Sequence, residues 1–583
     1  MTSAGFGETP DRLRPPAPRW DPPQIPDPEV VGRLVEALKL PAPVCEVLAT
    51  RGHEDVEVAK RFLRPRIEHL NDPEELADGA RAADRIVRAL SQGEIIFVHG
   101  DYDVDGICAT AILTRWLRQL GGTVVPFVPH RVRDGYDFSA SGLRAAQEAG
   151  AALIVTVDCG SVAHETIAAA NEIGIDVIVT DHHTVTDTLP DAYAVVNPKR
   201  PDCAYPAEDL CGSGLAWQLC RLVATRVGSD PSALEALLDL VALATVADLV
   251  PLVGDNRILV QYGLRQIARA PSMGVRALLR VAEVEADGVN AGKLGFQLAP
   301  RINAAGRIGE SGDALRLLLT DDEEVAHDLA HRLDALNRER RDEDRRTLDE
   351  ALAGLADSFD PQRDFGVVVD GEGWHPGVIG IVASRVVERL HRPVVMLARD
   401  GATARGSARS IPGFHLYEAL AACSEHLERF GGHRQAAGMD IRTDAIPAFR
   451  EAFDREARAR LTPELLQPML RPDIDVAIGE ADVQLAHWLA YLGPHGMGNP
   501  GPTFRARGLT VTDARVVGTG HLKARLQQAG ASLDAIGFGL ADRLPPETLG
   551  RGRWDALFRL ERNEYRGRVT AQAKLLDLRA EGA

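Results

Sequence analysis

The sequence lacks the features of membrane-spanning, secreted and fibrous proteins. It has no uninterrupted apolar run near the roughly 18–20 residues that a transmembrane helix needs. Its Pro-rich N-terminus contains no apolar core of the signal-peptide kind. Aromatic residues make up only 5%, but 45% hydrophobic and 26% charged residues are ordinary values for a globular protein. We therefore expect a soluble, cytoplasmic protein that does not bind membranes, with three or four domains in its 583 residues.

Cysteine is also scarce and poorly spaced for disulfides or zinc. The chain has seven cysteines, an odd number, and none of them forms a CxxC pair. Cys203, Cys211 and Cys220 lie near one another without the spacing of a zinc ribbon. We expect them to be buried thiols.

Positive charge is in deficit over most of the chain. The 66 basic and 84 acidic residues give a net charge of −18, which argues against an indiscriminate nucleic-acid binder because a polyanion needs cationic partners. The deficit ends at Asp473: from this residue to the end, the chain has 14 basic and 13 acidic residues. Six arginines crowd one short span near the end, which fits either a solvated rim or a phosphate-facing groove. They are Arg551, Arg553, Arg559, Arg562, Arg566 and Arg568.

Changes in apolar spacing divide the chain into five segments. From residue 94, short apolar runs alternate with helical stretches, which predicts a parallel sheet covered on both faces. Mixed charges at helical spacing predict a long connecting helix, and short strands with Gly turns predict a small C-terminal β-barrel. The expected fold class is therefore α/β. The segments are a flexible lead (1–28), a first α/β domain with an N-terminal helical cap (29–330), a connecting helix (331–358), a second α/β domain (359–462) and the barrel (463–583).

Acidic and imidazole side chains follow three of the predicted parallel strands. Ligands bind beyond the carboxyl ends of strands in such sheets. Each acid alone could be a helix N-cap, but so many negative charges brought together need a compensating cation. Carboxylates with one or two imidazoles suit Mn²⁺ or Mg²⁺. The residues are Asp101, Asp103 and Asp105, then Asp158, then Asp181, His182 and His183.

One more acid extends this set of oxygen ligands. Asp248 follows the apolar run LVALATVA, where it could also simply end a helix. Two neighbouring ions that share a carboxylate can activate water and stabilise a leaving oxygen in phosphoryl hydrolysis. The sequence thus predicts a two-metal phosphoesterase site.

The motifs resemble those of a known superfamily in both content and order. GDYDVDG (100–106), VDCGS (157–161), TDHH (180–183) and ATVADLVPL (244–252) resemble the four motifs of the DHH phosphoesterases, and most closely those of the RecJ single-strand-specific exonucleases. PRINAAGR (300–307) is similar to a RecJ segment on the cleft wall. The segments at 373–397, 405–410 and 430–439 resemble the DHH-associated second domain, and 489–504 resembles part of the RecJ OB-fold barrel.

The resemblance implies roles for the acids and imidazoles. Asp101, Asp103, Asp158, His182 and Asp248 would bind two Mn²⁺ or Mg²⁺ ions, with Asp158 bridging them. Asp105, Asp181 and His183 would be catalytic, the last two orienting ligands or contacting the scissile phosphate. Many small DHH enzymes have a His where this chain has Phe97, and His99 stands nearby as a possible substitute.

Further residues are candidates for substrate binding. Ser407 and Arg409, next to Gly406, suit a terminal phosphate, and by resemblance they hold the 5′ end. The family usually shows GYGLS where this chain has GYDFS, with Asp137 in place of Gly. Trp488 and Tyr491 could stack on bases, although we favour core packing for both. The remaining candidates are Arg131, Arg301, Asn303, Arg307 and His433, with an interdomain salt bridge as the alternative role of Arg301 or Arg307 and loop packing as that of His433.

Together these features predict a 5′→3′ exonuclease specific for single-stranded DNA, which releases mononucleotides during DNA repair and recombination. The resemblance also implies a monomer that works with a single-strand-binding protein and a RecQ-type helicase. One alternative is a phosphodiesterase of the same superfamily for cyclic dinucleotides or very short oligonucleotides, which would not need the barrel. Another is a DNA-binding scaffold without metals, which would not need the five predicted ligands.

Overall fold

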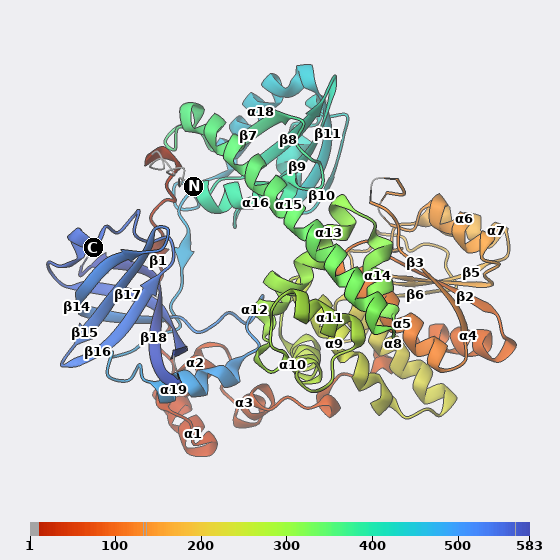
Figure 1. The fold of residues 1–583 in the computed structure, drawn as a ribbon, viewed down its shortest axis with the longest axis horizontal. Helices are drawn as coiled ribbons and strands as arrows, with labels where there is room; N and C mark the ends of the chain where they lie inside the picture. Colours follow the sequence, from red (N-terminus) through yellow and green to blue (C-terminus); the bar gives the residue numbers. More distant parts are fainter. Residues whose placement is uncertain (1–10, 132, 136, 566, 583) are drawn as a thin grey trace.

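The computed structural model describes residues 11–131, 133–135, 137–565 and 567–582, which form three domains and one long helix (Figure 1). Residues 1–10 of the predicted flexible lead lie outside the described residues. Within the described residues, the structure contains no helix that is both long and apolar enough to cross a bilayer. All seven cysteines are free thiols. Cys211 and Cys220 are buried as expected, whereas Cys203, also expected to be buried, is half-buried.

The first domain contains the predicted parallel sheet, in the order β3-β2-β4-β5-β6. Helices α4, α5 and α8 share a core with one face of this sheet, and α6 and α7 share a core with the other face. The chain leaves β2 toward one edge and β4 toward the other, so the strand order reverses between these two neighbours. The strands are β2 (Ile95–Gly100), β3 (Thr123–Phe127), β4 (Leu153–Val157), β5 (Asp176–Thr180) and β6 (Ala194–Val196). The helices are α4 (Gly79–Gln92), α5 (Val104–Gln119), α6 (Ala140–Glu148), α7 (His164–Glu172) and α8 (Gly212–Val227).

A helical half completes the first domain. Its central helix, α9, is apolar almost throughout and nearly every residue in it is buried, which is expected of a helix surrounded by others. The helices of this half are α9 (Leu238–Ala247), α10 (Gly254–Arg269), α11 (Met273–Val281), α12 (Ala291–Lys293), α13 (Ala299–Ile308) and α14 (Ser311–Leu319).

The predicted connecting helix is α15 (Glu323–Ser358), which is 36 residues long and runs from the first domain to the second (Figure 1). It begins before the predicted residue 331, because Asp322 caps it by accepting hydrogen bonds from the amides of Glu324 and Val325. Its apolar face packs on the first domain through Leu329 and Leu333, and on the second through Ala351 and Leu355. One rigid element therefore spans both domains.

The second domain is a mixed sheet in the order β10-β11-β9-β8-β7, covered by helices. Only β7 and β8 are parallel. Its strands are β7 (Val367–Glu372), β8 (Val394–Asp400), β9 (Thr403–Arg409), β10 (Arg429–Gly432) and β11 (Ala436–Arg442). Its helices are α16 (Ile379–Leu390), α17 (Leu416–Ala422) and α18 (Ile446–Arg460).

The third domain is the predicted β-barrel. Its strands lie side by side in the order β14-β15-β16-β18-β17, and pairing between β14 and β17 closes the barrel. The short strand β13 (Ile474–Asp475) extends one edge. The barrel strands are β14 (Phe504–Val517), β15 (His521–Gln528), β16 (Ala531–Gly537), β17 (Trp554–Tyr565) and β18 (Arg568–Ala580), with helices α19 (Val483–Leu489) and α20 (Pro546–Leu549).

The N-terminal helices differ from the prediction. Helices α1 (Pro28–Leu38), α2 (Ala42–Thr50) and α3 (Val56–Leu63) share a core with the barrel, so they do not cap the first sheet. Part of the predicted flexible lead is ordered as well, because β1 (Arg19–Trp20) pairs in parallel with β12 (Met469–Leu470) of the linker before the barrel. Amphipathic spacing shows that a helix buries one face, but it does not show against which partner.

Arg257 of α10 connects the first domain to this N-terminal and barrel unit. Its guanidinium is buried and donates hydrogen bonds to the carbonyl oxygens of Phe62, Tyr491 and Leu492. It also lies 3.8 Å from the centroid of the Phe62 ring. Burial and the charge of Arg51 lower the pKa of Arg257 to about 10. One side chain thus joins three chain segments through carbonyl acceptors.

We predict that Arg257→Leu destabilises the protein by about 2–4 kcal/mol, because the substitution leaves buried carbonyl oxygens without donors. Urea unfolding measures this loss. Arg265→Leu, on an exposed position of the same helix, is the matched control; it removes only a contact 5.0 Å from the centroid of the Tyr262 ring and should change the free energy of unfolding by under about 1 kcal/mol. Equal effects of the two substitutions would contradict the proposed connection.

Candidate active site

The acidic residues that follow the strands converge at the point where the strand order reverses. Asp101 follows β2, Asp158 follows β4 and Asp181 follows β5, and all three are buried. Because β2 and β4 are neighbours whose connections leave in opposite directions, their carboxyl ends border a crevice that no connection covers. The sheet topology therefore brings together acids that lie far apart in the sequence.

Backbone amides hold the carboxylates of the first motif in place. Asp103 caps α5 by accepting hydrogen bonds from the amides of Asp105 (2.9 Å) and Gly106 (3.1 Å). Asp105 accepts one hydrogen bond on each carboxylate oxygen, from the amides of Gly212 and Ser213 at the start of α8, both at 2.7 Å. Since a Cβ on Gly106 would lie 2.4 Å from the Asp101 nitrogen, only glycine fits this turn.

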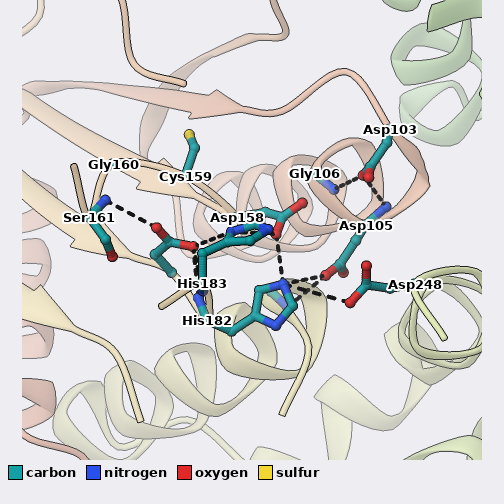
Figure 2. Close-up of polar contacts among 12 residues, drawn as sticks. Asp103, Asp105, Gly106, Asp158, Cys159, Gly160, Ser161, His182, His183 and Asp248 are labelled. Atoms are coloured by element: carbon teal, nitrogen blue, oxygen red, sulfur yellow. Dashed lines mark hydrogen bonds and ion pairs between the residues drawn. The ribbon is translucent and has the colours of Figure 1, made fainter. Parts of the chain in front are cut away.

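His182 lies among three carboxylates from different parts of the chain (Figure 2). Its Nε2 atom is 3.1 Å from Asp158 Oδ1, 3.6 Å from Asp248 Oδ2 and 3.7 Å from Asp105 Oδ2. Asp158 has a positive φ of 62°, and its amide donates a hydrogen bond to the Thr180 carbonyl. Its position is thus fixed by the neighbouring strand.

Asp181 and His183 form a strongly coupled pair beside this group. Asp181 Oδ1 lies 2.8 Å from His183 Nδ1, and Asp181 also accepts hydrogen bonds from the amides of Ser161, His182 and His183. Although burial opposes both shifts, the pair lowers the pKa of Asp181 and raises the pKa of His183 to about 9. His183 is therefore a cation at neutral pH in the metal-free protein.

The other carboxylates repel one another. Burial, followed by the charge of neighbouring aspartates, raises the pKa of Asp101, Asp103 and Asp158, and raises that of Asp248 to about 8. Burial lowers the pKa of His182 to about 4, so its imidazole is neutral. His183 and Arg131 lower these pKa values but do not offset burial and the neighbouring aspartates, so the carboxylates need further positive charge.

The unpartnered atoms fit a divalent metal. Asp101 Oδ1, Asp158 Oδ1 and both ring nitrogens of His182 are buried without a hydrogen-bond partner. Oxygen ligands with one imidazole and no thiolate suit Mn²⁺ or Mg²⁺. Three sets of potential ligand atoms each lie within 4.8 Å of one another. They are Asp101, Asp103 and Asp158; Asp105, His182 and Asp248; and Asp158, His182 and His183.

Two residues of the expected site bear on the ligand set. Asp105, expected as a catalytic residue, lies with His182 and Asp248, so its carboxylate is a further candidate ligand. His99 is buried against Phe127 and Phe138, with Nδ1 3.7 Å from Cys159 Sγ, and it belongs to none of the three ligand sets found among the described residues. His99 therefore does not take the place of the histidine that many small DHH enzymes have where this chain has Phe97.

A cavity of about 300 Å³ opens directly onto the carboxylates. Its lining combines acids and an imidazole with an aromatic, an amide and two guanidinium side chains. The residues are Asp101, Asp103, Asp105, His183 and Asp248, together with Tyr102, Arg131, Asn303, Gly306 and Arg307. Burial, and then the charges of Arg131, Arg340 and Arg409, lower the pKa of Arg307 to about 10. Arg307 therefore lies within electrostatic reach of three other arginines, of which Arg131 also lines the cavity.

Sequence reasoning missed Arg340, which α15 carries toward the other arginines. Its Nε atom is buried without a hydrogen-bond partner, and Asp344, one turn further along the helix, lies 3.9 Å from its Nη1. Arg340 stands in the mixed-charge run RERRDEDRR, where no pattern separates it from its solvated neighbours. Only the packing of α15 between the two domains distinguishes Arg340 from these neighbours.

Ser407 and Arg409 of β9 belong to the same arginine-rich region. Arg409 donates a hydrogen bond to Ser407 Oγ at 3.1 Å, and burial together with the nearby Arg131 lowers its pKa. The first turn of α16 lies against this pair, since a Cβ on Gly380 would be 2.9 Å from Ser407 Oγ and 3.0 Å from Arg409 Nη2. Guanidinium groups near a helix N-terminus favour an anion.

Four other candidates lie away from the cavity. Arg301 pairs with Asp334 of α15 at 2.9 Å, within the first domain's own packing. His433 is exposed in the turn between β10 and β11. Trp488 packs on the barrel core as favoured, whereas Tyr491 beside it is half exposed. None of the four lines the cavity.

Carboxylates and an imidazole that fit divalent metals, facing arginines across a cavity at the switch point of a parallel sheet, define a metal-dependent phosphoesterase. The chain matches the models of the DHH family, N-terminal domain (residues 95–245), the DHHA1 domain (364–459) and the RecJ OB domain (472–577). This chain belongs to the RecJ family.

Individual relatives cover almost the whole chain. The single-stranded-DNA-specific exonuclease RecJ of Dickeya dadantii is 38% identical over 91% of this chain and 95% of its own. RecJ of Escherichia coli is 36% identical over 92% and 95% respectively. The crystal structure of RecJ from Thermus thermophilus in complex with Mn²⁺ is similar with a TM-score of 0.84, at 33% identity over 97% of this chain and 80% of that one. All three domains are thus shared with RecJ proteins.

We predict that the metal-free protein loses stability as pH rises. Carboxylates whose pKa is raised by folding bind protons more tightly in the native state, so their contribution is complete near pH 4 and is lost as pH rises through their folded pKa, about 8 for Asp248. In chelator, the free energy of unfolding should fall from about pH 6 to about pH 8.5. Mn²⁺ should restore about 2.7 kcal/mol per ion at a hundredfold excess over its Kd.

Two variants isolate the carboxylate cluster in this experiment. Asp158→Asn should flatten the pH dependence in chelator and reduce the stabilisation by Mn²⁺. The exposed Asp187→Asn should behave as the wild-type protein does. A metal-free stability that rises with pH, or equal Mn²⁺ stabilisation of both variants, would contradict the ligand assignment.

Proposed function

We propose that this protein is an exonuclease that degrades single-stranded DNA from the 5′ end to mononucleotides with Mn²⁺ or Mg²⁺. The observation that carries the proposal is the cavity in which candidate metal ligands face Arg131, Asn303 and Arg307. Hydrolysis of a phosphodiester needs both groups of residues: the metal ligands, so that water is activated, and the cationic and amide side chains, so that the negative charge of the phosphate is bound. The family of single-strand-specific exonucleases to which the chain belongs supports the same substrate.

The chain's own residues prepare the site for hydrolysis. Asp101, Asp103, Asp105, Asp158, His182 and Asp248 would hold the ions, with Asp158 in position to contact both. When bound, the ions lower the pKa of water and screen the charge that develops on the phosphate. The hydrogen bond to Asp181 would orient His183 at the cavity wall, where its imidazole would contact the scissile phosphate. No covalent intermediate is required.

The arginine cluster explains why the proposed enzyme would start from the 5′ end of the strand. Arg131, Arg307 and Arg409 converge with Ser407 and the start of α16, which makes a site for a terminal phosphate rather than for a neutral hydroxyl. Arg340 adds a fourth positive charge to this site. A strand anchored by its 5′-phosphate would present its first internucleotide linkage to the carboxylates, so each cut would release one mononucleotide.

The barrel fits the role of gathering the strand. The predicted arginine-rich span lies in and before the β17–β18 hairpin, where Arg551, Arg553, Arg562 and Arg568 are exposed. Phe538 is also exposed, with Lys574 Nζ 5.6 Å from its ring centroid. Cationic and aromatic side chains of this kind bind single strands without reading their sequence. A phosphodiesterase for cyclic dinucleotides would gain nothing from them.

The wider setting of the enzyme follows from the proposed substrate and the family. Degrading single strands from a 5′ end serves DNA repair and recombination, and we propose that the protein does this in the cytoplasm. We propose that it acts as a monomer, since both walls of the cavity come from one chain. A single-strand-binding protein and a RecQ-type helicase are its proposed partners, on the basis of the family resemblance.

We predict immediate release of labelled mononucleotide from a 5′-labelled single strand in Mn²⁺. A 3′-labelled strand should release its label last, and blunt duplex and a cyclic dinucleotide should remain intact. Asp158→Ala should abolish the release. Early release of the 3′ label would overturn the polarity, and turnover of the cyclic dinucleotide alone would overturn the substrate.

Removing Arg409 tests the terminal-phosphate site in the same assay. Arg409→Ala should raise KM for a 5′-phosphorylated strand about tenfold, because a charged hydrogen-bond partner is lost. KM for a 5′-hydroxyl strand should change little. Arg405→Ala, an exposed arginine on the same strand, is the control and should leave both substrates unaffected.

A further inference from the structure

Close contacts at glycines connect the carboxylate cluster to the terminal-phosphate site. The first is at Gly306 of α13, which also lines the cavity. A Cβ on Gly306 would lie 2.6 Å from the carbonyl oxygen of Tyr102. Tyr102 separates the candidate ligands Asp101 and Asp103 in the sequence. The end of α13 therefore approaches the first motif this closely only because residue 306 has no side chain.

The next residue of α13, Arg307, contacts the second domain in two ways. Its Nη1 atom donates a hydrogen bond to the carbonyl oxygen of Gly377 at 3.0 Å. A Cβ on Gly377 would lie 2.6 Å from the carbonyl oxygen of Arg307, which is a backbone atom and cannot turn aside as the end of a side chain can. Arg307 therefore connects the two domains through both its side chain and its backbone.

Gly377 leads into α16, whose first turn completes the connection. A Cβ on Gly380 would meet both Ser407 and Arg409 within 3.0 Å, so this turn lies directly on the pair that is proposed to bind the terminal phosphate. The path from the first motif to this pair thus runs through the end of α13 and the start of α16.

An ion pair holds α16 further along the helix. Arg385 Nη2 lies 3.0 Å from Oδ2 of Asp344 on α15, and the Asp344 side chain is completely buried. Because one partner is shielded from water, the pair is screened less than a surface ion pair. Since α15 also packs on the first domain, this pair gives α16 a second connection to that domain.

We propose that Gly377 is a positioning residue whose contact with Arg307 keeps the terminal-phosphate site one nucleotide away from the metal centre. The inference rests on the function proposed above. Successive phosphates of a strand are separated by one nucleoside, so the distance between the two sites determines which linkage reaches the carboxylate cluster once the 5′-phosphate is bound. A side chain at residue 377 would separate Arg307 from α16 and displace the first linkage from that cluster. Gly377 therefore acts on the chemical step, whereas Arg409 acts on binding.

Two variants change the spacing, and a third is their matched control. Gly377→Ala adds one methyl group at the contact and leaves every candidate ligand and phosphate-binding side chain in place. Arg385→Gln breaks the ion pair with Asp344 without adding bulk, so it tests the same spacing independently of whether Gly377→Ala folds. Gly354→Ala is the control, because Gly354 is exposed on α15 and a Cβ there meets nothing within 4 Å. Thermal denaturation of each variant shows whether it folds.

Digestion of single strands in Mn²⁺ gives the first readout. On a 5′-phosphorylated strand, Gly377→Ala should lower kcat about tenfold with KM within about twofold of wild type, because the terminal phosphate still binds but the linkage is displaced. On a 5′-hydroxyl strand, which the terminal-phosphate site does not hold, kcat should stay within about twofold of wild type. An unchanged kcat on the phosphorylated strand, or an equal loss on both strands, would overturn the inference.

Binding of a nucleoside bisphosphate gives a second readout that needs no turnover. Deoxythymidine 3′,5′-bisphosphate carries two phosphates one nucleoside apart, whereas deoxythymidine 5′-monophosphate carries one. In Mn²⁺, calorimetric titration of the wild-type protein and of Gly354→Ala should show at least about tenfold tighter binding of the bisphosphate, because one ligand then occupies both sites. Gly377→Ala should reduce this ratio to about twofold, and Arg385→Gln should lower it about threefold.

The ratio of the two affinities also separates this inference from the proposed function. A ratio near one in the wild-type protein, or the wild-type ratio in every folded variant, would overturn the inference. If the wild-type protein digests no single strand at all, the proposed function fails, while the ratio still decides whether the two sites lie one nucleotide apart.

Discussion

The mutual repulsion of buried carboxylates is the constraint on which the rest of this structure depends. Candidate ligands from three strand ends and from the ends of two helices meet in a space where like charges are costly. The fold stabilises them individually, with backbone amides for Asp103, Asp105 and Asp181. It leaves Asp101 Oδ1, Asp158 Oδ1 and the His182 nitrogens without partners. A divalent metal relieves the repulsion, and the same charge makes a phosphate a suitable substrate.

The remaining elements position a substrate relative to that centre. The switch point of the sheet leaves the carboxylates uncovered, and α15 spans both domains, which brings Arg409 of the second domain near Arg131 and Arg307 of the first. Arg257 fixes the barrel unit to the first domain. The enzyme thus combines a fixed metal centre with an arginine-rich site and a strand-binding barrel.

Much of this arrangement could be predicted from the sequence, because continuous apolar runs followed by acids specify both a parallel strand and what lies at its end. The three domains, the connecting helix and the ligand cluster follow from that pattern and from the resemblance. The rest depends on long-range packing. Nothing local shows that α1–α3 pack on the barrel, that Arg340 is the arginine of its run whose Nε atom is buried, that Asp105 faces His182, or that Arg301 turns toward Asp334.

The most direct test of the account is a crystal structure of the protein with Mn²⁺, with the metal located by anomalous scattering. The account predicts two peaks on either side of the Asp158 carboxylate. One should be bounded by Asp101 and Asp103, and the other by Asp105, His182 and Asp248. A single peak away from Asp158, or no peak at a saturating Mn²⁺ concentration, would contradict the claim that this carboxylate cluster is a two-metal centre.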